Sequence, residues 1–154
     1  MNIKFKPHKR VDVPLRIKWY NNPRVKRYLG FEKDRKVTKK TSNEWFDSYE
    51  KEFRKGTKKF FLICDDKIPV GIVGLSRISK INKNCDIFIA IGNDDYLRKG
   101  VATKAMHFVI DYGFKKLGLH KMNLGVFADN KAAVGLYNKI GFEIEGTIKD
   151  ESFF

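Results

Sequence analysis

Two clusters of residues in the C-terminal half of this sequence have types and spacings that could do chemistry. In the first, residues 94–103, Arg98 and Lys99 stand directly before Gly100, between a strand-like run and a helix-like run. A helix that begins there presents unpaired amide N–H groups and the positive end of its dipole beside two cations. The cluster therefore indicates a site for a phosphate or pyrophosphate. The alternative is an ordinary helix start, since neither GxxxxGK[ST] nor GxGxxG is present.

The second cluster, residues 129–142, is predicted to contain a helix with an amide, a methyl group and a phenol on one face. Asn130 and Tyr137 lie seven residues apart, so their directions differ by only about 20° on a helix. Ala133 lies one turn before Tyr137. These side chains could line a narrow slot with a hydroxyl at its end. Alternatively, Tyr137 is a half-buried packing residue whose hydroxyl is hydrogen-bonded to water.

Together the clusters resemble the GNAT N-acetyltransferase superfamily, whose acetyl-CoA motif is [QR]xxGx[GA] and whose later motif is approximately NxxAxxxYxKxGF. The first motif corresponds to residues 97–102 and departs from the pattern at Leu97, where Gln or Arg is usual. The second is nearly complete over residues 130–142. An apolar residue at the position of Leu97 is common in a bacterial-like branch, which comprises enzymes resembling ribosomal-protein alanine N-acetyltransferases and nucleotide amino-sugar N-acetyltransferases.

The resemblance implies an α/β (α+β) fold with a mixed central sheet of six to seven strands flanked by about four helices. Two adjacent parallel strands splay apart in such folds, and the pantetheine arm of acetyl-CoA fills the gap as an extra strand would. The pyrophosphate lies on the amides of the first cluster, and no metal is implied. The expected cofactor-binding residues are Phe88, Ile89, Ala90, Ile91, Leu97, Arg98, Lys99, Gly100, Val101, Ala102, Thr103, Asn130, Ala133 and Tyr137.

For catalysis, the resemblance implies that the acceptor amine attacks acetyl-CoA directly, without a covalent enzyme intermediate. Tyr137 would protonate the departing thiolate, a suitable task for a phenol with a reference pKa of about 10. Asp86, on the strand before the first cluster, is the expected general base, with water as a relay. The alternative is that Asp86 is an exposed strand residue.

Other titratable residues are weaker candidates. Glu32 and Glu44 could border the acceptor pocket. His107 and His120 are expected to be structural or solvated, because no carboxylate stands at a fixed offset from either.

Hydrophobic periodicity and turn residues predict the elements that must position these groups. A capping box at residues 41–44 is expected to open a helix that ends before Gly56. A βαβ unit joins the two clusters, and Gly118 and Gly141 end its helix and the following one. The predicted strands are 3–7, 59–64, 68–76, 85–91, 121–127 and one beginning at 142, and the predicted helices are 12–20, 41–54, 100–117 and 129–140; residues 30–40 are expected to form a surface loop.

Composition places limits on the class of protein. The 154 residues, of which 42% are hydrophobic, suit one domain with one core. No apolar run is long enough for a signal peptide or a membrane span, so we expect a cytoplasmic protein. Cys64 and Cys85 lie in strand-like runs and are expected to be reduced core thiols. The family's usual seventh strand is expected to be absent or truncated, and a homodimer through the exposed sheet edge is expected.

The formal net charge of +14 favours polyanionic partners, including CoA, nucleotide sugars and ribosomes, or it merely keeps the protein soluble. We therefore expect the acceptor to be a protein N-terminus or an amino sugar, and a polyamine only if its pocket is acidic. A nucleic-acid-binding module is the alternative from another class, and it is disfavoured because the lysines are spread along the chain. A protein of this fold that binds acetyl-CoA without catalysis is a further alternative.

Overall fold

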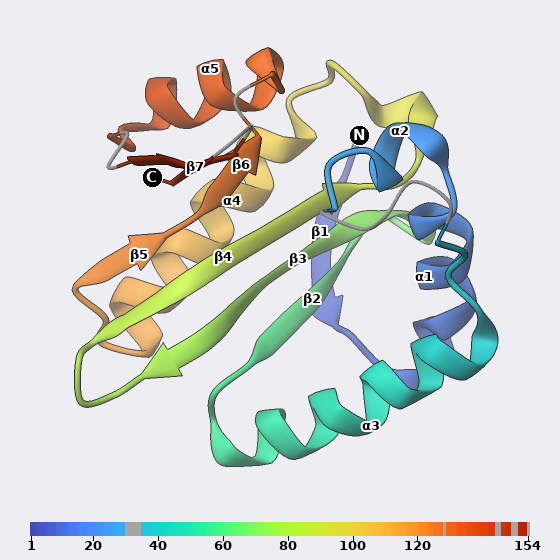
Figure 1. Ribbon diagram of the computed structural model, residues 1–154, viewed down its shortest axis with the longest axis horizontal. Coiled ribbons are helices and arrows are strands. Elements are labelled where there is room, and N and C mark those ends of the chain that lie inside the picture. Colours follow the sequence, from blue (N-terminus) through green and yellow to red (C-terminus); the bar gives the residue numbers. More distant parts are fainter. Residues whose placement is uncertain (30–34, 128, 144–145, 149–150, 154) are drawn as a thin grey trace.

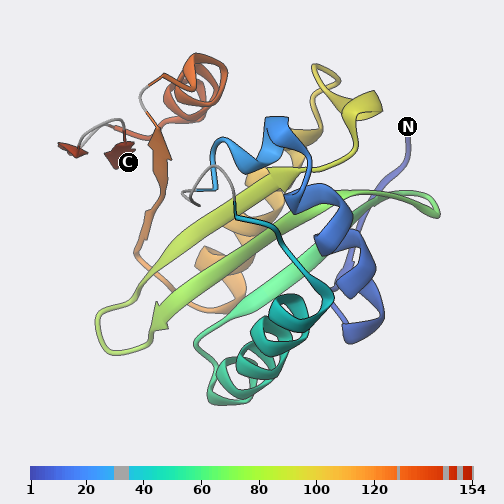
Figure 2. The same ribbon diagram turned by 45° about the vertical axis from the view of Figure 1, so that its right-hand side comes forward.

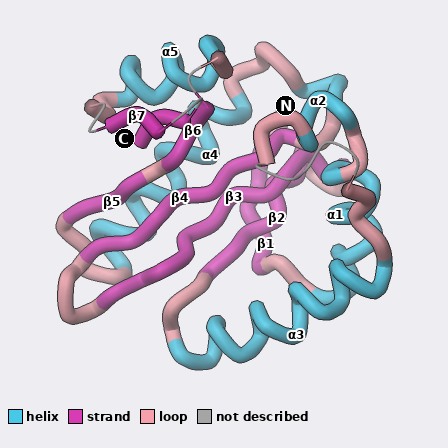
Figure 3. Tube along the Cα trace, in the orientation of Figure 1, coloured by secondary structure: helices cyan, strands magenta, loops and turns pink. Residues whose placement is uncertain are grey.

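The computed structural model describes residues 1–29, 35–127, 129–143, 146–148 and 151–153, with side chains described through residue 143. Five strands form the central sheet in the order β1-β2-β3-β4-β5 (Figures 1 and 3). Pairing is antiparallel from β1 to β4 and parallel between β4 and β5. These strands are β1 (Ile3–Pro7), β2 (Lys59–Asp65), β3 (Ile68–Ser79), β4 (Asn84–Ile91) and β5 (Lys121–Asn123).

The sheet is buried on both faces because helices cover each of them. Helices α1 (Val13–Tyr20) and α3 (Lys39–Lys55) lie on one face and α4 (Val101–Asp111) lies on the other (Figures 1 and 2). Alternate side chains of β2 enter different cores, as the period of two in a strand requires. Phe61 and Ile63 join the core that contains α4, and Phe60 and Leu62 join the core that contains α1 and α3. This explains the nearly continuous apolar sequence of β2.

Both cysteines are buried free thiols, as predicted. They cannot pair with each other in this fold, because Cys64 belongs to the core on the α3 side and Cys85 to the core on the α4 side. Burial raises the pKa of the Cys85 thiol to about 12. The described helices include none that is long and apolar enough to cross a membrane.

The start of α3 differs from the prediction. The N-cap is Thr38, which exchanges hydrogen bonds with Thr41, so the helix begins at Lys39 rather than at a box formed by residues 41–44. A Thr pair thus replaces the expected Thr/Glu pair in the same reciprocal arrangement. The helix ends where expected, at Gly56, whose φ of +80° favours glycine. Of the predicted loop 30–40, residues 30–34 lie outside the described residues.

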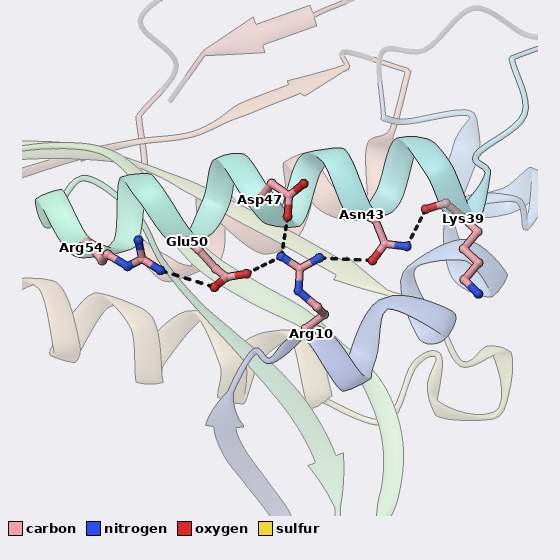
Figure 4. A network of polar contacts seen from close by, with 6 residues as sticks. All are labelled: Arg10, Lys39, Asn43, Asp47, Glu50 and Arg54. Atoms are coloured by element: carbon pink, nitrogen blue, oxygen red, sulfur yellow. Dashed lines mark hydrogen bonds and ion pairs between the residues drawn. The ribbon is translucent and has the colours of Figure 1, made fainter.

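The N-terminal segment is tied to α3 by a polar network (Figure 4). Arg10, in the short 3-10 helix η1 (Arg10–Asp12), donates to Asn43 at 3.2 Å, to Asp47 at 2.6 Å and to Glu50. Glu50 also pairs with Arg54 at 3.7 Å. Because these side chains are largely solvated, the network contributes little net free energy and mainly fixes where η1 lies on α3.

The protein is expected to lose stability in acid because the imidazole of His8 is buried. The His8 side chain is fully buried, Nδ1 lies 3.4 Å from Asp12 Oδ2, and burial lowers the pKa of the imidazole to about 4. The unfolded chain takes up this proton near pH 6.5, so the free energy of unfolding should fall as the pH drops from about 6.5 towards 4. Urea denaturation at pH 7.0 and 5.0 measures the loss. His8→Gln should flatten the pH dependence, and an equal dependence in both proteins would contradict the assignment.

After β4 the chain forms the predicted βαβ unit with two changes. Helix α4 begins at Val101 and ends at Asp111, and a π-helical turn, η3 (Tyr112–Lys116), completes the expected helix. The predicted strand 121–127 is two strands, β5 and β6 (Gly125–Phe127), which belong to different sheets. Leu124 stands between them and is buried in the α4 core.

A second, three-stranded sheet has the order β6-β8-β7. Helix α5 (Lys131–Ile140) lies beside it, and Gly141 ends α5 with a φ of +117°, as predicted. The last predicted strand begins later than residue 142, as β7 (Gly146–Ile148). Where we expected a strand to be missing, β8 (Glu151–Phe153) pairs antiparallel with both β6 and β7. The homodimer expected through this edge stays a prediction.

Candidate active site

Strands β4 and β5 part where the site begins. Their parallel pairing covers Asn84 to Asp86 and ends at the pair Asp86 and Asn123. Beyond it, β4 continues to Ile91, while β6 turns away and pairs with β8 (Figure 1). This is the splay that the resemblance predicts, and it leaves one edge of β4 without a neighbouring strand among the described residues.

The register identifies which backbone groups of β4 face this gap. β3 and β4 pair without a shift from Ser76/Asp86 to Gly71/Ile91, and the amide of Gly92 donates to Val70 in β3. Because the polar groups of a strand alternate between its two edges, those of Ile87, Ile89 and Ile91 face the gap. Those of Phe88 and Ala90 face β3. Of the four β4 residues among the expected cofactor-binding residues, Ile89 and Ile91 therefore present backbone groups to the gap.

A cavity of about 180 Å³ occupies the gap. Its walls come from β4, from the segment that joins β5 to β6, from α5 and from the segment after α1. Asn130 and Tyr137 both line it, so the structure brings together the two polar residues of the second sequence cluster. The lining residues are Arg24, Val25, Tyr28, Leu29, Ile87, Phe88, Ile89, Ala90, Ile91, Leu124, Gly125, Asn130 and Tyr137.

The first sequence cluster forms an anion-binding loop at the start of α4. Gly100 is the N-cap of α4 with a φ of +77°, and Arg98 also has a positive φ of +60°. Within the described part of the chain, the amides of residues 98–103 donate to no protein acceptor, and a Cβ at Gly100 would meet no atom within 4 Å. Open space over unpaired amides at a helix N-terminus suits a pyrophosphate. Gly100 is required here chiefly by its backbone conformation.

The side chains around this loop add positive charge. Arg98 and Lys99 are exposed, and the Lys99 ammonium lies 5.5 Å from the centre of the Tyr96 ring. Tyr96 donates to Asp65 at 2.7 Å, which anchors the loop to the end of β2. Leu97 is exposed and faces no described polar partner, so this departure from the motif removes a side chain but none of the amides.

Tyr137 is 6% exposed, and burial raises its pKa to about 12. The phenol therefore carries its proton throughout the physiological pH range, and a buried hydroxyl at the wall of the gap can donate to an anion formed there. Asn130 caps α5, accepting from the Ala133 amide at 3.3 Å. Its NH₂ group remains a donor at the cavity wall. Ala133 is half-buried and does not appear among the residues that line the cavity.

The Tyr137 ionisation gives a prediction that needs no substrate. Phenolate absorbance of the native protein between pH 9 and 12 should fall short of that of the unfolded chain, which titrates near pH 10, because the pKa values of Tyr20, Tyr49, Tyr96 and Tyr137 are all raised. Tyr137 accounts for one of these late titrations. Tyr137→Phe should remove only this late titration. Because the folded pKa is raised, the associated stabilisation is present below pH 10 and is lost as the pH rises through about 12. Titration of all six tyrosines near pH 10 would contradict the buried position.

Asp86 lies outside the cavity that holds Tyr137. It lines an adjoining hollow of about 850 Å³, together with Arg77, Lys121 and Asn123. The two hollows share lining residues from β4 and from the segments after α1 and β5. Asp86 Oδ2 lies 3.7 Å from Arg77 Nε, and the Arg77 side chain is 86% exposed. Asp86 thus stands where the strands part, beside the gap, and its role as base stays a prediction.

The remaining candidates lie elsewhere. Glu44 is exposed on α3 and lines neither hollow, and Glu32 is outside the described residues. His107 and His120 are exposed. Among the described residues there is no group of three potential metal ligands. Arg24, Tyr28 and Leu29 line the cavity although none of them was among the individual site residues predicted from the sequence. The segment that contains them, residues 19–29, resembles the acceptor-side elements of the family branch named above.

Residues 2–143 match the acetyltransferase (GNAT) domain family. This chain belongs to the GNAT acetyltransferases. It is therefore an N-acetyltransferase that transfers an acetyl group from acetyl-CoA to an amine.

Similar proteins are enzymes of the same kind. A spermidine N(1)-acetyltransferase of Escherichia coli K12 is 32% identical over 152 residues, covering 99% of this chain and 78% of the relative. The acetyltransferase PseH of Campylobacter jejuni is 26% identical over 90% of this chain and 82% of its own. Spermidine N-acetyltransferase from Vibrio cholerae, solved with CoA and spermine, superposes with a TM-score of 0.83 at 25% identity, covering 99% of this chain and 92% of that one.

Proposed function

We propose that this chain acetylates a small polyamine of the spermidine class. The observation that carries the proposal is the 32% identity to the E. coli spermidine N(1)-acetyltransferase over nearly the whole chain. The comparisons thus favour the alternative acceptor of the sequence analysis over a protein N-terminus or an amino sugar.

The net charge of +14 argued against a polycation, but it is a property of the whole surface. Binding depends on the local field, which carboxylates near the acceptor control. Asp86 lines the hollow beside the gap, and its described cationic partner, Arg77, is mostly in solvent at 3.7 Å. An ammonium group can replace such a weakly held guanidinium at little cost. Asp86 is therefore the carboxylate that we expect to receive the acceptor.

In this proposal, acetyl-CoA binds in the gap beside β4 and the amine binds in the adjoining hollow. Acetyl-CoA supplies an activated thioester. The gap-facing groups of Ile89 orient its pantetheine arm as a neighbouring strand would, and the amides of residues 98–103 hold its pyrophosphate. Asp86 attracts the ammonium and, through water, takes its proton. Tyr137 keeps its own proton for the sulfur that leaves.

A second candidate, an anionic amine such as a phosphate-linked amino sugar, has one observation in its favour. Arg77 and Lys121 line the same hollow as Asp86, so cations outnumber carboxylates among its described lining residues. The two candidates make opposite demands on these side chains. Asp86 assists a polyamine and hinders an anionic acceptor, whereas Arg77 does the reverse.

An amine panel assayed by CoA release tests the proposal. It includes spermidine, spermine, a nucleotide-linked amino sugar and a peptide with an N-terminal alanine. Spermidine or spermine should give the highest kcat/KM, Asp86→Asn should raise the KM for spermidine about tenfold, and Arg77→Gln should leave it equal or lower. Turnover of the amino sugar alone, with KM raised by Arg77→Gln, would replace this function by the second candidate.

A further inference from the structure

The short segment after α1 forms a roof over the cavity in the gap. It contains α2 (Pro23–Lys26) and continues to residue 29. Four of its residues, Arg24, Val25, Tyr28 and Leu29, line the cavity. In Figure 2 the segment lies across the end of β4, close to the loop that leads to α4. Its attachment to that loop therefore affects how the gap is covered.

Arg24 makes this attachment. Its Nε donates to Asp94 Oδ1 at 2.7 Å and its Nη2 donates to the carbonyl oxygen of Ile91 at 2.7 Å. Asn22 Nδ2 adds a bond to the same Asp94 oxygen at 3.1 Å. A guanidinium suits this position because its planar fork serves a carboxylate and a carbonyl at once. One side chain thus joins the roof, the end of β4 and the loop before the pyrophosphate amides.

The Ile91 carbonyl is the last backbone group of β4 that faces the gap. Because Arg24 already donates to this oxygen, an extra strand placed along β4 would compete with the guanidinium at Ile91, whereas at Ile87 and Ile89 it would not. Arg24 therefore limits how far strand-like pairing extends towards the loop.

Asp94 brings a negative charge to the start of the anion-binding loop. It begins the 3-10 helix η2 (Asp94–Tyr96), a few residues before the amides of residues 98–103. The Arg24 bond lowers the pKa of Asp94, so this carboxylate stays ionised. Without Arg24, an uncompensated charge would stand beside the place of the pyrophosphate and would repel it.

We propose that Arg24 is a positioning residue for acetyl-CoA, which masks the charge of Asp94 next to the pyrophosphate loop and ends the strand-like pairing at Ile89. It acts through these groups and through the roof, and it takes no part in proton transfer. The proposal concerns the donor side alone, so it stands or falls independently of the acceptor.

Calorimetric titration with CoA, which needs no turnover, tests this role. Arg24→Gln should raise the dissociation constant of CoA about tenfold and the KM for acetyl-CoA similarly, with kcat changed by less than about threefold. Arg24→Lys should recover little, because an ammonium lacks the fork. Adding Asp94→Asn to Arg24→Gln should restore most of the affinity, since it removes the unmasked charge.

The double variant separates positioning from folding. A merely destabilised protein would lose melting temperature, and Asp94→Asn would not restore its affinity for CoA. Arg27→Gln is the matched control, because Arg27 in the same segment makes an exposed pair with Asp129 at 3.0 Å; its CoA affinity should stay within about twofold. An unchanged CoA affinity in Arg24→Gln, or a failure of Asp94→Asn to rescue it in a folded protein, would overturn the proposal.

Discussion

Replacing Tyr137 by Phe is expected to lower kcat about 100-fold while the dissociation constant of acetyl-CoA stays within about twofold. The change removes one oxygen from a side chain that is 6% exposed and leaves the ring in its packing against Phe142. The variant can still bind the co-substrate, but it lacks the proton donor for the leaving sulfur. Steady-state CoA release and calorimetry with CoA separate the two effects.

A matched control for this variant is Tyr112→Phe. Tyr112 is half-buried, packs edge-on against Phe61 at 5.2 Å, and lines neither hollow of the site. Its loss should change kcat by less than about twofold, because packing is retained and no reacting group is removed. If Tyr137→Phe kept full turnover, Tyr137 would be a packing residue, and the proton would reach the sulfur from solvent.

The starts of the two helices at which we expect acetyl-CoA to bind could be predicted from the sequence because their signals are local. Gly100 is the N-cap of α4 and Asn130 is the N-cap of α5, and both lie in motifs whose spacing reflects backbone requirements. A helix terminus, its cap and its unpaired amides are set by a few neighbouring residues. Tyr137 followed from the helical period once the start of α5 was approximately known.

The parting of β5 and β6 could not be predicted in the same way. Residues 121–127 show one apolar alternation, which looks alike whether the strand continues or changes its partner after Asn123. Which edge a strand pairs with is decided by the rest of the sheet and not by its own side chains. The resemblance supplied the splay, and the structure placed it between Asn123 and Gly125.

The roof over the gap depends on contacts between distant parts of the sequence. Arg24 meets Asp94 across 70 positions, and an arginine that follows Asn-Pro carries no signal of such a partner. The hollow beside the gap also depends on distant residues, since Arg77, Asp86 and Lys121 come from three different strands or their ends. Charge counted along the chain consequently could not decide the acceptor, because the sum conceals which charges share a surface.

Replacing Ala102 by Glu should raise the dissociation constant of CoA at least about 100-fold without lowering the stability of the protein. Ala102 is the second residue of α4, beside the unpaired amides of the loop. A carboxylate in the first turn of a helix interacts favourably with the helix dipole, by roughly 0.3–1 kcal/mol. The same charge repels a pyrophosphate and competes for its amides. The affinity for CoA, measured by calorimetry, should therefore fall, whereas the melting temperature should stay the same or rise.

Two control variants separate the effect of side-chain size on CoA binding from the effect of charge. Ala102→Gln has nearly the same volume as Ala102→Glu without the charge, so any loss that it shares is steric. Lys104→Glu, on the exposed next turn of α4, changes the net charge more but lies beyond the first-turn amides, and it should weaken CoA binding by less than about fivefold at physiological salt. Equal losses in Ala102→Gln and Ala102→Glu would show that the start of α4 excludes bulk and does not select an anion. If only Ala102→Glu weakens CoA binding, the pyrophosphate must lie on the amides at the start of α4. Neither added bulk at residue 102 nor a charge farther along α4 would then explain the loss.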